Sequence, residues 1–188
     1  MNARHIPNVI SIARMGLVYP IVWLLLERQF QTALALMVVA GLSDALDGWL
    51  ARHYHWQSRL GSCLDPAADK LLLVTGYLAL ASMGLLSVWL AVAIVVRDAV
   101  ILLGAAAYYV LVGPFDGQPL RISKFNTFLQ LLLLIMVIFS QAFLPLPTML
   151  LEAVSLIVFI TTVLSGASYV YIWANKYRSR TGRQSPGR

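Results

Sequence analysis

Six long apolar stretches dominate this sequence and determine the solvent in which it can fold. They run from about 8 to 26, 32 to 51, 66 to 86, 88 to 111, 124 to 143 and 149 to 173. Each is close to the roughly 20 residues that an α-helix needs to cross a bilayer. Charged residues make up only 12% of the chain, against about 25% in a soluble domain. The sequence therefore predicts an all-α integral membrane protein with six transmembrane helices.

The chain is long enough for one domain of ordinary size. We expect residues 1–175 to form one six-helix membrane domain and residues 176–188 to form a basic, disordered cytoplasmic tail. The first apolar run is too long for a signal-peptide core and has no small-residue cleavage site, so we interpret it as a retained span. The net charge of +6 favours cytoplasmic loops that face anionic lipid, and no nucleic-acid partner is expected.

Basic residues gather on one side of the predicted bilayer. They include Arg4, Arg52, Arg59, Arg121, Lys124 and the basic tail, whereas Arg28 is the basic residue of the opposite loops. The positive-inside rule then places both termini in the cytoplasm, which agrees with an even number of spans. We expect a bacterial cytoplasmic (inner) membrane, with the functional site on its cytoplasmic side.

Four of the eight acidic residues lie in one predicted helical hairpin. Asp44 and Asp47 are three residues apart near the end of the second run, and Asp65 and Asp69 are four apart near the start of the third. Each pair shares a helix face, and antiparallel helices would bring all four to one depth. An Asp inside a membrane costs about 2.5 to 3.5 kcal/mol on insertion scales. Four unpaired carboxylates therefore require compensation.

Two divalent cations would neutralise these carboxylates completely. Carboxylate oxygens are hard ligands suited to Mg²⁺ or Mn²⁺, and open coordination positions bind phosphates. The sequence thus predicts a two-metal, phosphate-handling site at the cytoplasmic edge. Gly48, Ala51 and Gly61 would let a flat ligand approach the backbone, although plain helix packing explains them equally well. Asp65 before Pro66 also fits a helix N-cap, which would explain that carboxylate alone.

The acids and their neighbours form two motifs, Asp44-Ala-Leu-Asp47-Gly48-Trp-Leu-Ala51-Arg52 and Gly61-Ser-Cys-Leu-Asp65-Pro-Ala-Ala-Asp69. Together they resemble the signature of the CDP-alcohol phosphatidyltransferases, DxxDGxxAR followed by GxxxDxxxD, at every defining position. The similarity continues from Pro7 and Asn8, through the segment 122–127, to the sixth apolar run. Eight fixed residues at fixed spacing on a membrane hairpin make this a highly specific match.

The resemblance implies a six-helix homodimeric enzyme that transfers a phosphatidyl group from CDP-diacylglycerol to an alcohol and releases CMP. The implied ligands of two divalent cations are Asp44, Asp47, Asp65 and Asp69. Asp69 is also the implied general base, which would take the proton of the acceptor hydroxyl. The implied CDP-binding residues are Gly48, Ala51, Arg52 and Gly61.

Basic residues farther along the chain are candidates for binding the acceptor. Arg97, beside Asp98 in the middle of the fourth run, fits either a substrate pocket or a structural ion pair. The resemblance implies that Arg121 and Lys124 bind the acceptor's phosphate, although the positive-inside rule alone would place them there. Asn126, Thr127 and Gln130 either line that pocket or form interhelical hydrogen bonds.

Two further cations, Arg14 and Lys70, have alternative interpretations. The segment with Asn8 and Arg14 is similar to the family's N-terminal pattern, which suggests a lid near the nucleotide or headgroup. We favour an interfacial helix start in which Arg14 snorkels to the water. Lys70 either pairs with an Asp of the site or marks the cytoplasmic end of its helix.

The acceptor and the function class are separate questions. The segments 40–44, 60–62 and 122–127 look closer to family members that use phosphatidylglycerol and make cardiolipin. The alternative acceptor is glycerol 3-phosphate, which would give phosphatidylglycerophosphate; inositol phosphate and serine are less favoured.

Outside this class of enzymes, a membrane cation transporter would usually show carboxylates at the midplane and internal repeats. A prenyltransferase would show a different Asp spacing.

Overall fold

The computed structural model is entirely helical over the backbone that it describes, which is 6–53, 61–112 and 121–181. Side chains are described at 12–43, 46, 49, 53, 69–106 and 122–172. Within these limits there are six helices: α1 (Ile6–Leu26), α2 (Phe30–His53), α3 (Gly61–Ser82), α4 (Val88–Val112), α5 (Arg121–Ala142) and α6 (Thr148–Thr181). The prediction of an all-α, six-helix chain is therefore confirmed.

Two helix boundaries differ from the prediction. Helix α3 begins at Gly61 instead of 66, so Asp65 lies inside the helix and the prediction of an N-cap there is wrong. Helix α6 continues to Thr181, so the prediction of disorder is wrong for residues 176–181. No Gly or Pro interrupts that stretch before Gly182, and basic side chains suit the negative end of a helix dipole.

Three segments of the described chain are long and apolar enough to cross a membrane: Val88–Ala106, Ile122–Ala142 and Thr148–Ile172. Ile12–Leu26 and Phe30–Ser43 are shorter apolar helices. Large apolar side chains, among them Tyr19, Leu102 and Met149, are exposed. Water would not tolerate so much exposed apolar surface, whereas lipid would. The structure thus supports an integral membrane protein, and the full set of six spans stays a prediction.

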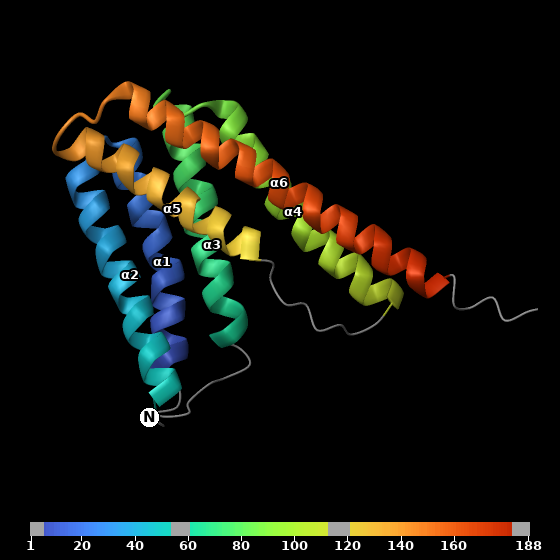
Figure 1. The fold of residues 1–188 in the computed structure, drawn as a ribbon. Coiled ribbons are helices and arrows are strands. Elements are labelled where there is room, and N and C mark those ends of the chain that lie inside the picture. The colour runs from blue at the N-terminus through green and yellow to red at the C-terminus, as the bar shows by residue number, and fades with distance from the viewer. Residues whose placement is uncertain (1–5, 54–60, 113–120, 182–188) are drawn as a thin grey trace, which may run out of the picture.

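The helices form a bundle from which one pair extends (Figure 1). Helix α1 packs against both α2 and α3, and α5 crosses the bundle and also packs against both. Helices α4 and α6 lie side by side and point away from it. In the described chain, α2 and α3 each pack against α1 and α5 and make little contact with each other. The two helices that carry the acidic motifs are therefore held apart by their neighbours.

Buried polar side chains connect α3, α5 and α6 inside the apolar core. The Tyr77 hydroxyl donates to the Gln130 carbonyl at 2.9 Å, and Gln130 Nε2 donates to Thr162 Oγ1 at 3.2 Å. Thr162 also donates to Asn126 Oδ1 at 3.0 Å. All four residues are buried. In an apolar surrounding such bonds fix helix register, because an unpaired polar group is costly.

Two helix ends use the same turn with different residues. After α3, the Gly84 and Leu85 amides donate to the Ala81 and Leu80 carbonyls, and Gly84 has φ +73°. After α1, the Arg28 and Gln29 amides donate to Leu25 and Leu24 in the same pattern. Arg28 has φ 58°. Both are Schellman turns, whose left-handed position favours Gly.

We predict that Arg28→Gly raises the thermal unfolding midpoint in detergent. Gly has no Cβ, so it avoids the steric cost of the left-handed conformation, which is about 1 kcal/mol. For a chain of this size, that free energy corresponds to a rise in the midpoint of about 2–4 °C. Gly84→Ala should lower the midpoint by a similar amount. A Cβ at Gly84 has nothing within 4 Å, so the change would report the backbone alone. Midpoints that move in the opposite directions would contradict this account of the turns.

Candidate functional site

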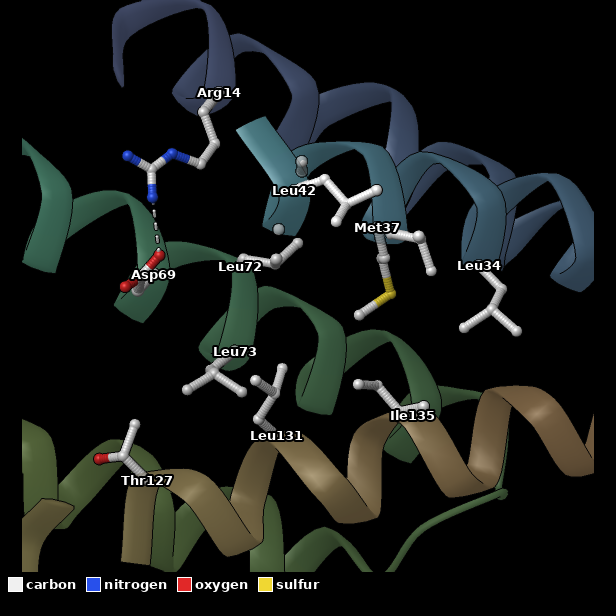
Figure 2. Close-up of a pocket in the computed structure, with 13 residues that line it drawn as sticks. Arg14, Leu34, Met37, Leu42, Asp69, Leu72, Leu73, Thr127, Leu131 and Ile135 are labelled. Atoms are coloured by element: carbon white, nitrogen blue, oxygen red, sulfur yellow. Dashed lines mark hydrogen bonds and ion pairs between the residues drawn. The ribbon is translucent and has the colours of Figure 1, made fainter. Parts of the chain in front are cut away.

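A cavity of about 420 Å³ lies among α1, α2, α3 and α5. Its walls are mostly aliphatic, with Leu34, Met37 and Leu42 from α2, Leu72 and Leu73 from α3, and Leu131 and Ile135 from α5 (Figure 2). Among the described side chains, three polar ones also line it: Arg14, Asp69 and Thr127. Figure 2 shows Arg14 and Asp69 together at one end of the row of aliphatic side chains. A pocket of this kind suits a ligand with an apolar body and a charged end.

An ion pair defines the polar end of this pocket. Arg14 Nη1 of α1 lies 3.2 Å from Asp69 Oδ1 of α3. The Arg14 side chain is 5% exposed, whereas that of Asp69 is 56% exposed. Arg14 therefore does not snorkel to the water, and our prediction for it is wrong. The reason is that a carboxylate of another helix lies within reach of the guanidinium inside the bundle.

The four acidic residues lie on the two motif helices. Asp44 and Asp47 are near the end of α2, and Asp65 and Asp69 are in the first part of α3. The side chains of Asp44, Asp47 and Asp65 lie outside the described residues. Within the described residues no group of three or more metal-ligating side chains occurs. Asp69, with its exposed carboxylate at the pocket, has the donor chemistry and access that a divalent cation needs.

Several other predicted site residues also lie outside the described side chains. These are Gly48, Ala51, Arg52, Gly61 and Arg121. The backbone of each belongs to a described helix: α2 for the first three, α3 for Gly61 and α5 for Arg121. The nucleotide role that the resemblance implies for the first four therefore remains a prediction.

Arg97 forms a buried network that joins four helices. Its guanidinium contacts Asp98 on α4, donates to Ser123 on α5, and donates to Ser165 on α6 at 2.9 Å. Lys70 on α3 pairs with the same Asp98 oxygen at 2.9 Å. The Arg97 side chain is 4% exposed and that of Lys70 is 45% exposed. The less favoured alternative for Arg97, a structural ion pair with Asp98, is present in the structure, and the acceptor-binding role that we favoured for it stays a prediction. The partner of Lys70 is also Asp98.

The first turns of α5 divide their polar side chains between two environments. Lys124 is exposed and Thr127 lines the pocket. Asn126 and Gln130 instead form the interhelical hydrogen bonds described above. Sequence reasoning missed Ser165, which is fully buried against Arg97. The signal that could have indicated it is Arg97, because an arginine in the middle of an apolar helix needs a polar partner on a neighbouring helix.

Comparisons with known proteins agree with the motifs. A model of the CDP-alcohol phosphatidyltransferase family matches residues 4–172. A protein of Rattus norvegicus named cardiolipin synthase (CMP-forming) is 39% identical over 150 residues, covering 70% of this chain and 49% of that protein. One of the same name from Streptomyces coelicolor is 38% identical over 103 residues, 52% of this chain and 48% of its own.

A relative with a different name is also similar. The chloroplastic CDP-diacylglycerol–glycerol-3-phosphate 3-phosphatidyltransferase 1 of Oryza sativa is 35% identical over 147 residues. The match covers 69% of this chain and 44% of that protein. The chain thus spans about half the length of these curated relatives.

We predict that Arg97→Met destabilises the protein by about 3 kcal/mol, because it removes one partner of a buried pair. The double variant Arg97→Met/Asp98→Asn should be more stable than the single one, since it no longer leaves a carboxylate without its main cation. Lys70→Met should lower the free energy of unfolding by at most about 1 kcal/mol, because half-exposed ion pairs are weak. Denaturation in detergent measures all three. A double variant less stable than Arg97→Met would contradict the network.

Proposed function

This chain belongs to the CDP-alcohol phosphatidyltransferase family, and we propose that it transfers a phosphatidyl group from CDP-diacylglycerol to a glycerol-type alcohol, with release of CMP. The observation that carries the proposal is Asp69. It completes the family's double Asp motif and lies at the polar end of an apolar pocket. A carboxylate at the edge of an aliphatic cavity fits a lipid substrate whose reacting phosphate lies at the membrane surface.

The donor's diphosphate requires positive charge beside the acidic motif. Asp44, Asp47, Asp65 and Asp69 would hold two divalent cations, Mg²⁺ or Mn²⁺. When bound, such ions neutralise charge on the diphosphate and on departing CMP. Gly48, Ala51 and Gly61 would leave room for the cytidine beside the backbone, and Arg52 would contact the nucleotide or its phosphates. This assignment rests on the motif positions at the C-terminal end of α2 and the N-terminal end of α3.

Asp69 would act as the general base. The acceptor hydroxyl oxygen forms a bond to the phosphorus that carries diacylglycerol, while the bond from that phosphorus to the CMP oxygen breaks. Asp69 takes the hydroxyl proton, and CMP leaves with the electron pair of the broken bond. Its 56% exposed side chain leaves the carboxylate accessible to a hydroxyl that enters from the pocket or from the water.

Phosphatidylglycerol is the preferred acceptor in this proposal, and the product would be cardiolipin. Relatives from Rattus norvegicus and Streptomyces coelicolor carry that name. The rice relative, whose name specifies glycerol 3-phosphate, supports the alternative product phosphatidylglycerophosphate. Arg121 and Lys124 would bind the phosphate that both acceptors share. Arg97 would assist them, because it bonds to Ser123, the neighbour of Lys124. Membership of the family argues against a cation transporter.

The enzyme would lie in a bacterial inner membrane as a homodimer of six-span chains, with both termini and the site on the cytoplasmic side. The exposed apolar side chains and the three described spans support insertion in lipid. The distribution of Arg and Lys between the loops supports the orientation.

CMP release by the purified protein tests the proposal. CDP-diacylglycerol and Mg²⁺ or Mn²⁺ would be supplied, with phosphatidylglycerol and glycerol 3-phosphate offered in separate reactions. We expect metal-dependent CMP release with phosphatidylglycerol and recovery of cardiolipin. Release with glycerol 3-phosphate alone would establish the alternative acceptor. Failure to bind CDP-diacylglycerol at all would contradict the proposal.

We predict that Asp69→Asn lowers kcat by at least about 100-fold, because a lost general base is worth 10²–10⁴-fold. The affinity for CDP-diacylglycerol should change much less, since the base acts mainly in the transition state. Glu152→Gln is the matched control, as Glu152 is an exposed acid of α6 far from the motif helices in sequence. Turnover of Asp69→Asn near that of the wild type would remove Asp69 from the mechanism.

A further inference from the structure

Arg14 is a buried cation of the pocket that belongs to neither of the two acidic motifs. It lies on α1, whose Ile21 and Leu25 are part of the hydrophobic core. Helix α1 packs against both α2 and α3, so its position is fixed relative to the two acidic motifs. The side chain of Arg14 is 5% exposed and its guanidinium meets Asp69 at 3.2 Å.

The burial of Arg14 needs a reason beyond helix packing. An arginine inside a membrane bundle costs several kcal/mol unless it has a partner, and an interfacial helix start would leave the guanidinium in water. Here the cation is nearly enclosed, while its acidic partner remains largely accessible. Packing therefore constrains the arginine more than it constrains the carboxylate.

Building on the proposed function, we propose that Arg14 is a positioning residue, which fixes the Asp69 side chain at the polar end of the pocket. A guanidinium has N–H donors and no acceptor, so Arg14 cannot itself accept the hydroxyl proton. It can restrict the carboxylate to one orientation through the contact of Nη1 with Oδ1. Because α1 is rigidly packed, that orientation is set before the substrate arrives.

Orientation of this kind affects the chemical step more than binding. A base that is misplaced by about 1 Å can cost about 100-fold in rate. The apolar walls of the pocket, which come from α2, α3 and α5, do not depend on Arg14. We therefore expect loss of the arginine to lower kcat while the pocket continues to accept the lipid substrate.

The test compares Arg14→Met, Arg14→Lys and the control Arg28→Met, all as full chains in detergent. Arg28 is the exposed arginine just beyond the other end of α1. We expect Arg14→Met to lower kcat about 10- to 100-fold, with the KM for CDP-diacylglycerol within about threefold of the wild type. Arg14→Lys should recover part of the loss, and Arg28→Met should match the wild type.

A second readout does not depend on activity. Thermal midpoints of the wild type, Arg14→Met, Asp69→Ala and the double variant form a double-mutant cycle. We expect the effects of the single variants not to add, because each removes the same ion pair. Additive midpoints would contradict the contact itself, even in a protein that turns over normally.

Three kinetic results would overturn the proposal. Unchanged kcat in Arg14→Met would show that Asp69 needs no such orientation. A rise in the KM for CDP-diacylglycerol without a fall in kcat would make Arg14 a residue that binds the donor. Increased turnover would make it a competitor for Asp69. An inactive wild type would instead contradict the proposed function, and the double-mutant cycle would still test the pair.

Discussion

The need to compensate acidic side chains in an apolar bundle governs this structure. Two of the described acids are paired with a nearly buried arginine: Asp69 with Arg14, and Asp98 with Arg97. In both pairs the cation is the more deeply buried partner. An arginine enclosed by helices is costly without an anion, and a carboxylate is equally costly without a cation. The two pairs therefore connect helices that are distant in sequence, α1 to α3, and α4 to α5 and α6 through the serines around Arg97.

The pocket follows from the same packing. Helices α1 and α5 each contact α2 and α3, and they keep the motif helices far enough apart to leave an aliphatic cavity between them. Gln130 donates a hydrogen bond to Thr162 and Asn126 accepts one from it. These bonds fix α5 against α6 and leave Thr127 on the pocket side. An apolar cavity that ends at a carboxylate and a guanidinium can hold a lipid with its reacting phosphate at the acidic motif, which is the arrangement that the proposed transfer needs.

Much of the fold could be predicted because membrane helices are encoded by local hydropathy. The six apolar runs gave the helices, and fixed Asp spacing indicated the site. Long-range pairing was less accessible. Arg14 and Asp69 are 55 residues apart, and only the position of α1 between the motif helices makes them partners. Lys70 follows Asp69 in sequence but pairs with Asp98, because adjacent residues on a helix point in different directions. The left-handed backbone of Arg28 could not be predicted either, because arginine rarely adopts that conformation.

The proposed phosphatidyl transfer depends on two divalent cations held by the four motif carboxylates. Counting Mn²⁺ bound per chain in the presence of CDP, by electron paramagnetic resonance on the purified protein, tests it most directly. We expect two Mn²⁺ ions per chain, and weaker binding in Asp44→Asn and Asp65→Asn variants that remain folded. A protein that binds CDP but no Mn²⁺, or whose Mn²⁺ binding is unchanged in both variants, would contradict it.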